Sequence, residues 1–122
     1  SVGIMQGFKS FMLQSEDGSE TLPTSSLASG INFYSAGPEH AYLKQIGRVN
    51  YTFATDKKAF EAFQLLCRTE GILPAFEPSF ALAKTIELAK KMSGKILVCN
   101  ICGRGDKDID TAEKMLGDKL DK

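Results

Sequence analysis

The residues best suited to chemistry lie in a glycine-rich turn, Gly-Arg-Gly-Asp-Lys-Asp at positions 103–108, which directly follows an apolar run. Glycine at 103 and 105 lets the backbone turn sharply or approach a flat ligand. In open α/β sheets, ligands bind beyond the carboxyl ends of the strands, and this turn is expected at such an end. The two glycines are equally compatible with a purely structural turn. Without a third glycine before a helix they form no dinucleotide-binding motif.

Two further titratable residues stand near expected helix starts. Glu77 lies in Pro-Ala-Phe-Glu-Pro, residues 74–78. We interpret it first as an acidic residue favoured by the helix dipole, with a partly desolvated carboxylate beside a ligand as the alternative. His40 is the only histidine, which excludes a histidine-rich metal site and a two-histidine acid/base pair. We expect it to pack against or cap a helix.

The chain has three cysteines, Cys67, Cys99 and Cys102. Cys99 and Cys102 have the spacing of a redox pair, but they fall inside an apolar run. Reduced thiols in a cytoplasmic protein are therefore the preferred interpretation.

Composition narrows the classes of partner. Hydrophobic residues form 43% and charged residues 25% of the 122 residues, which favours one folded domain and excludes a disordered chain. The 15 basic and 15 acidic residues balance, so the chain lacks the positive field that nucleic-acid or anionic-membrane binding needs. No apolar stretch is long enough for a membrane span, and no signal-peptide pattern is present. Because the chain begins at Ser1 without methionine, we expect a processed or excised piece.

The elements that must position these residues alternate between strand and helix. We expect extended structure over residues 4–14, a turn at Asp17-Gly18, and a packed loop over 19–37. Pro38 and Gly47 bracket a helix over 39–46, and a β-favouring run covers 48–53. Thr55 is a suitable cap for a helix that Gly71 ends.

The second half of the pattern predicts a buried parallel strand. Leu82, Ile86, Ala89 and Met92 recur at helical spacing before Gly94. Residues 95–102, Lys-Ile-Leu-Val-Cys-Asn-Ile-Cys, are typical of a strand that is covered on both faces of a parallel sheet. A last helix is expected near 111–116. The fold class is α/β.

Long blocks of this sequence resemble the C-terminal part of the tryptophan synthase beta chain, in the same order and spacing. The blocks are Gly-Pro-Glu-His-Ala-Tyr-Leu at 37–43, Gly-Arg at 47–48, Glu-Ala-Phe at 61–63, Arg-Thr-Glu-Gly-Ile-Leu-Pro-Ala at 68–75, Glu77, and the turn at 103–108. The resemblance implies a segment of a fold-type-II, pyridoxal-phosphate-dependent lyase. That enzyme replaces the β-hydroxyl of L-serine with indole.

The resemblance also implies roles for particular residues. Cys102 takes the place of a serine that meets the pyridine nitrogen of the cofactor, with Gly103 beside it and Glu77 as the pocket carboxylate. Asn32 replaces an aspartate that closes the site over the substrate. Backbone carbonyls of Ile31, Phe33 and Ser35 correspond to a site for a monovalent cation, Na⁺ or K⁺, and Phe80 stands where the family has histidine.

The Schiff-base lysine, the acid/base glutamate and the phosphate-binding loop of the family lie earlier in its chain. No catalytic residue is therefore expected within residues 1–122, and this piece alone is expected to be inactive. The family implies an alpha-chain partner and a homodimer of full-length chains. Two alternatives remain open: a divergent pyridoxal-phosphate enzyme acting on another amino acid, and a non-catalytic module that associates with another chain.

Overall fold

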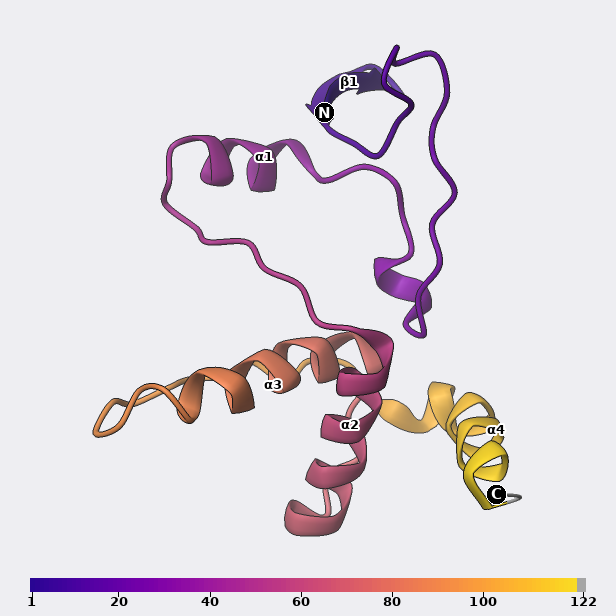
Figure 1. Ribbon diagram of the computed structural model, residues 1–122, viewed down its shortest axis with the longest axis vertical. Helices are drawn as coiled ribbons and strands as arrows, with labels where there is room; N and C mark the ends of the chain where they lie inside the picture. The colour runs from indigo at the N-terminus through magenta and orange to yellow at the C-terminus, as the bar shows by residue number, and fades with distance from the viewer. Residues whose placement is uncertain (121–122) are drawn as a thin grey trace. The chain divides into compact units, whose positions relative to one another are not determined.

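The structure is a computed structural model that describes residues 1–120, with side chains described as far as residue 117. It combines helices with a small antiparallel sheet (Figure 1). The chain divides into two compact units, Ser1–Thr52 and Phe53–Lys122, and each is described by itself. In the described residues, none of the helices has the length and apolar character needed to span a membrane.

The first unit begins with a β-hairpin. Strands β1 (Val2–Met5) and β2 (Phe8–Phe11) pair antiparallel. Gln6 and Gly7 form the turn between them, with φ of 47° and 84°, a geometry that suits the right-handed twist of a hairpin. The extended structure expected over 4–14 is confirmed except at Gln6 and Gly7, where the turn was not predicted. The expected turn at Asp17-Gly18 is present as well, closed by an isolated bridge between Gln14 and Thr21.

A loop and one helix complete the first unit. The loop contains the 3₁₀ turn η1 (Ser29–Ile31) and leads into α1 (Pro38–Gln45). Pro38 opens α1 and Gly47 follows its end with φ of 69°, as predicted. The strand predicted over 48–53 is wrong, because this run finds no strand to pair with in the described part of the chain.

The second unit is built on two helices that meet near their N-terminal ends and diverge along their length (Figure 1). Helix α2 (Asp56–Glu70) begins at Thr55, whose Oγ1 accepts the Lys58 N–H at 3.4 Å, and ends at Gly71 with φ of 66°. Helix α3 (Phe76–Ala89) ends before Met92, earlier than predicted.

The core of the second unit is aromatic. Phe60 and Phe63 of α2 pack against Phe76 of α3, with ring centroids 6.2 and 5.1 Å from that of Phe76. Each fully buried phenylalanine stabilises the fold by about 1.5–3 kcal/mol. Phe76 is the first residue of α3, so this cluster fixes the start of that helix. The two residues before it, Pro74 and Ala75, are also buried.

The expected strand at 95–102 is also wrong: the structure leaves these residues extended but unpaired. A strand needs a neighbour for its N–H and C=O groups, and the described part of this unit, residues 53–120, contains no strand. The parallel sheet is therefore not formed within the described residues. Beyond this segment, η2 (Gly105–Asp108) and α4 (Ile109–Leu120) confirm the expected turn and helix, with α4 longer than predicted.

Candidate functional site

The glycine turn docks on the start of α3. The Gly105 N–H donates to the Leu73 carbonyl at 3.2 Å. A Cβ at Gly105 would overlap the carbonyl oxygen of Pro74, so only glycine permits this approach. Two segments about 30 residues apart in sequence are thereby held backbone to backbone.

Asp108 caps α3 from this turn. The residue at the N-cap position, Ala75, has no side chain that can accept a hydrogen bond. Instead, the buried Asp108 carboxylate accepts the Phe76 N–H through Oδ2 at 2.9 Å. A carboxylate at this position satisfies one of the free N–H groups of the first turn and interacts favourably with the helix dipole.

Lys107 lies between two carboxylates. Its Nζ is 3.2 and 2.9 Å from Oε1 and Oε2 of Glu77, and 2.8 and 2.9 Å from Oδ1 and Oδ2 of Asp108. The hydrogen bond to Asp108, followed by the bond to Glu77, raises the pKa of Lys107 above the usual lysine value, while desolvation opposes the rise. Glu77 is thus held by the turn in addition to occupying the first turn of α3.

Cys102 and Gly103 stand at the entrance to the same turn. The Cys102 side chain is exposed, and Gly103 has φ of 77°, a backbone conformation that favours glycine. A Cβ on Gly103 would lie 3.2 Å from the Cβ of Ala75, two residues before Glu77. The turn therefore lies against the start of α3, so that Gly103, with Cys102 next to it in sequence, is near Glu77; all three were predicted to bind the cofactor.

The other predicted site residues lie in the first unit. Ile31, Asn32, Phe33 and Ser35 share the loop that follows β2. The Asn32 N–H donates to Ser29 O at 3.2 Å and the Phe33 N–H to Ile31 O at 3.0 Å, so the loop is tightly turned here. The placement of this loop and the roles of its residues stay predictions.

His40, Cys67 and Cys99 belong to neither group of predicted site residues. His40 Nδ1 shares a 2.9 Å hydrogen bond with the Tyr51 hydroxyl, and the two rings meet edge to face, in agreement with the expected packing role. All three cysteines are free thiols, and burial raises the pKa of Cys67. Along the extended segment Cys99 is half-buried and Cys102 exposed.

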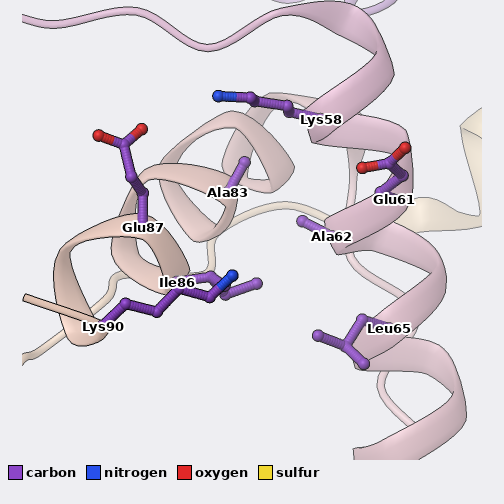
Figure 2. A pocket seen from close by; sticks show the side chains of 8 residues that line it. All are labelled: Lys58, Glu61, Ala62, Leu65, Ala83, Ile86, Glu87 and Lys90. Carbon is purple, nitrogen blue, oxygen red and sulfur yellow. The ribbon is translucent and has the colours of Figure 1, made fainter.

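A separate groove of about 310 Å³ runs between α2 and α3. Figure 2 shows Ala62 and Leu65 of α2 facing Ala83 and Ile86 of α3, with charged side chains at the rim. One rim residue is Glu87, whose pKa the Lys84 ammonium lowers from 2.8 Å away. None of the predicted site residues lines this groove. It offers an apolar floor with two lysines and two glutamates at the rim.

Lys107 and Asp108 are the residues that sequence reasoning missed, because it considered the glycines of the 103–108 turn and the motif as a whole but gave neither side chain a role. A signal was present: a lysine flanked by acidic residues directly after a glycine turn is suited to reach other carboxylates. Its partners, Glu77 and Phe76, lie 30 and 32 residues earlier, and nothing local identifies them.

Comparison with known proteins supports the resemblance seen in the motifs. No family model matches the chain. It is 49% identical to the tryptophan synthase beta chain of Mycobacterium leprae (strain TN) over 116 residues, which are 94% of this chain and 28% of the relative. It is 48% identical to the beta chain of Jannaschia sp. (strain CCS1) over 120 residues, 98% of this chain and 29% of the relative.

A third relative gives the same result. The tryptophan synthase beta chain of Allorhizobium ampelinum is 49% identical over 118 residues, 96% of this chain and 29% of the relative. The resemblance to tryptophan synthase beta chains is therefore confirmed over nearly the whole sequence. The chain spans less than a third of the length of these relatives.

Proposed function

We propose that this chain is the C-terminal segment of a tryptophan synthase beta chain, whose full-length form uses pyridoxal 5′-phosphate to replace the hydroxyl of L-serine with indole. The observation that carries the proposal is identity of 46–49% to proteins of that name over 94–98% of the chain. The second unit supports it, because the glycine turn and Glu77 lie at one end of α3.

The residues at this end fit one side of a cofactor pocket. The exposed Cys102 carries a thiol, which while protonated is a neutral, weak hydrogen-bond donor suited to a pyridine nitrogen. Gly103 has no side chain to obstruct a flat ring, and Glu77 places a carboxylate nearby. When bound, the cofactor supplies an electron sink that permits elimination and replacement at the β-carbon of an amino acid. The chain's own residues hold and orient it from the ring-nitrogen side.

The loop of the first unit has two proposed roles. The carbonyl oxygens of Ile31, Phe33 and Ser35 are hard ligands that suit Na⁺ or K⁺. Asn32 contributes a neutral hydrogen bond to closure of the site over the substrate. A neutral amide forms a weaker contact than a carboxylate paired with a cation, so closure is expected to be looser than with aspartate.

The rest of the enzyme supplies what this segment lacks. The lysine that binds the cofactor covalently and the phosphate-binding loop belong to the upstream part of the chain. Residues 95–102 complete a parallel sheet with upstream strands, which gives the α/β fold expected from the sequence. Exposure supports this: Ile96 and Val98 are 93% and 92% exposed, while the intervening Leu97 is half-buried. The exposure of the side chains thus alternates along residues 96–98 as it does in a strand.

The substrates and protein partners that we propose follow from the name of the relatives. Substrates are L-serine and indole, an alpha chain is the second subunit, and two full-length beta chains form a homodimer. The three free thiols suit a reducing compartment, and we place the enzyme in the cytoplasm.

The direct test compares the full-length protein with the 122-residue chain. Each is incubated with pyridoxal phosphate, L-serine and indole, and tryptophan is measured by chromatography. We expect tryptophan only from the full-length protein, because the lysine and the phosphate site lie outside this chain. Failure of the full-length protein to form tryptophan would overturn the proposal, as would a substrate-dependent cofactor absorption band from the 122-residue chain alone.

A second candidate rests on the residues that depart from the family pattern: Asn32, Phe80 and Cys102. All three belong to the proposed surroundings of the cofactor and substrate, so the full-length enzyme would act on another β-substituted amino acid. Turnover with L-serine, L-threonine and other β-substituted amino acids separates the two candidates. A higher kcat/KM for any substrate other than L-serine favours this one.

A further inference from the structure

The Lys107 ammonium contacts two carboxylates, and one of them, that of Asp108, is itself fixed in position. Asp108 is anchored by the backbone, since its Oδ2 accepts the Phe76 N–H at 2.9 Å, and its side chain is only 11% exposed. Both Asp108 oxygens lie within 2.9 Å of Lys107 Nζ. The position of the ammonium is therefore set by a buried, backbone-bonded carboxylate.

Both carboxylate oxygens of Glu77 contact the Lys107 ammonium. Lys107 Nζ lies 2.9 Å from Oε2 and 3.2 Å from Oε1. Contact with both oxygens restricts rotation of the carboxylate about its last torsion, which is otherwise broad. The Glu77 side chain is 22% exposed, so solvent competes only partly for these contacts.

We infer that Lys107 is a positioning residue for the proposed reaction: anchored by Asp108, it orients the Glu77 carboxylate at the end of α3 where Cys102 and Gly103 face the cofactor. The inference rests on the proposed function and deepens it. An ion pair of this exposure contributes little to stability, about 0–1 kcal/mol, so its main effect is on geometry. A misplacement of about 1 Å at a reacting centre lowers the rate by as much as about 100-fold.

The competing explanation is that Lys107 only neutralises Asp108 and so supports the fold. A double-mutant cycle separates the two explanations, because an effect that passes through Glu77 disappears once the Glu77 carboxylate is removed. Lys107→Met is therefore made in the full-length protein with Glu77 and again with Glu77→Gln. Lys107→Arg keeps the charge, and Lys114→Met, an exposed lysine on α4, is the matched control.

Three quantities are measured for each variant loaded with pyridoxal phosphate: kcat, KM for L-serine, and the absorption spectrum of the bound cofactor before substrate is added. We expect Lys107→Met to lower kcat about 10- to 100-fold and to alter the spectrum, with KM changed less than about threefold. Lys107→Arg restores most of kcat, and Lys114→Met changes nothing. In the Glu77→Gln background, Lys107→Met lowers kcat by less than about twofold further.

Equal losses in the two backgrounds would overturn the inference, as would an unchanged kcat and spectrum in Lys107→Met. Thermal unfolding is recorded in parallel. If Lys107→Met does not fold, Lys107→Gln replaces it, since its amide still donates to Asp108 without a charge for Glu77, and the same pattern is required. A wild-type protein that forms no tryptophan contradicts the proposed function, whereas an active wild type with a normal Lys107→Met contradicts only the role of Lys107.

Discussion

Under the proposed function, Cys102 is the residue that departs most directly from the family pattern, because a thiol stands where a hydroxyl is expected. A thiol is a larger, weaker donor than a hydroxyl, yet both are neutral while protonated. Its side chain is exposed at the entrance to the turn. Under the proposed function, the hydrogen bond to the ring nitrogen would therefore be weaker from Cys102 than from a serine.

Replacing Cys102 with serine tests this interpretation. In the full-length protein we expect Cys102→Ser to keep kcat for tryptophan formation or raise it up to about tenfold, because a hydroxyl forms the stronger hydrogen bond. Steady-state rates with L-serine and indole measure the effect. Cys99→Ser, on the same extended segment, is the control. Complete loss of activity in Cys102→Ser would show that the ring-nitrogen role has been assigned to the wrong residue.

Asp17 gives a residue-level prediction that is independent of the enzyme. Hydrogen bonds from the Ser15 hydroxyl and from the backbone and hydroxyl of Ser19 lower the pKa of Asp17 to about 2. Because the folded-state pKa lies below the unfolded value near 3.9, the contribution of Asp17 to the turn is present above pH ~4. It is lost as the pH falls through about 2.

Carboxyl ¹³C NMR during an acid titration checks this prediction. The Asp17 signal is expected to titrate near pH 2, and Ser15→Ala, which removes the largest cause of the shift, is expected to move it upward. Glu16→Gln, a change at the adjacent exposed side chain, should leave the Asp17 titration where it is. An Asp17 signal that titrates near 3.9 in the unaltered chain would contradict the hydrogen bonds of this turn.

At the scale of elements, the helices follow from local signals, whereas the pairing of strands does not. Thr55 and Gly71 mark the two ends of α2 because a cap hydrogen bond and a positive φ are decided within a few residues. The runs at 48–53 and 95–102 have equally clear β composition, yet neither pairs. Strand formation depends on partners elsewhere in the chain, and composition alone contains no information about whether those partners are present.

The same limit explains which part of the candidate site was predictable. Glu77, Cys102 and Gly103 were selected through the family resemblance, and their common location at the start of α3 was not predictable from the residues. That location depends on Gly105 docking on Leu73 and on Asp108 capping Phe76. Both contacts join segments about 30 residues apart.

The cap from Asp108 gives a prediction for the element it supports. Asp108→Ala leaves the buried Phe76 N–H without its acceptor, and we expect the free energy of unfolding of the full-length protein to fall by about 1–3 kcal/mol. Denaturant-induced unfolding measures this change. Asp106→Ala is the matched control, since Asp106 is 59% exposed and pairs with the exposed Arg104 across 3.3 Å. It is expected to cost less than about 0.5 kcal/mol. Equal losses for the two variants would exclude the cap as the cause.

At the scale of the whole molecule, the composition does not predict the apolar side chains that are exposed along residues 95–102. Hydrophobic content and charge balance predict a folded domain, yet Ile96 and Val98 are almost fully exposed and residues 95–102 remain unpaired. Exposed apolar segments of this kind are sites of association with other chains. Under the proposed function, the partner for this segment is the remainder of a full-length beta chain, since the match covers only 28–29% of the relatives.

If upstream strands cover residues 95–102 in the full-length protein, one substitution should destabilise the full-length protein but reduce self-association of the 122-residue chain. In the full-length protein, Ile96→Lys places a charge inside a completed sheet, and we expect the free energy of unfolding to fall by about 3 kcal/mol or more, measured by denaturant unfolding. In the 122-residue chain the same change removes an exposed apolar side chain, so self-association measured by light scattering decreases. Ile96→Val, which keeps the β-branched apolar character, changes either measurement only slightly. If Ile96→Lys leaves the full-length protein as stable as the wild type, residues 95–102 are not an interior strand, and the upstream chain does not cover this face.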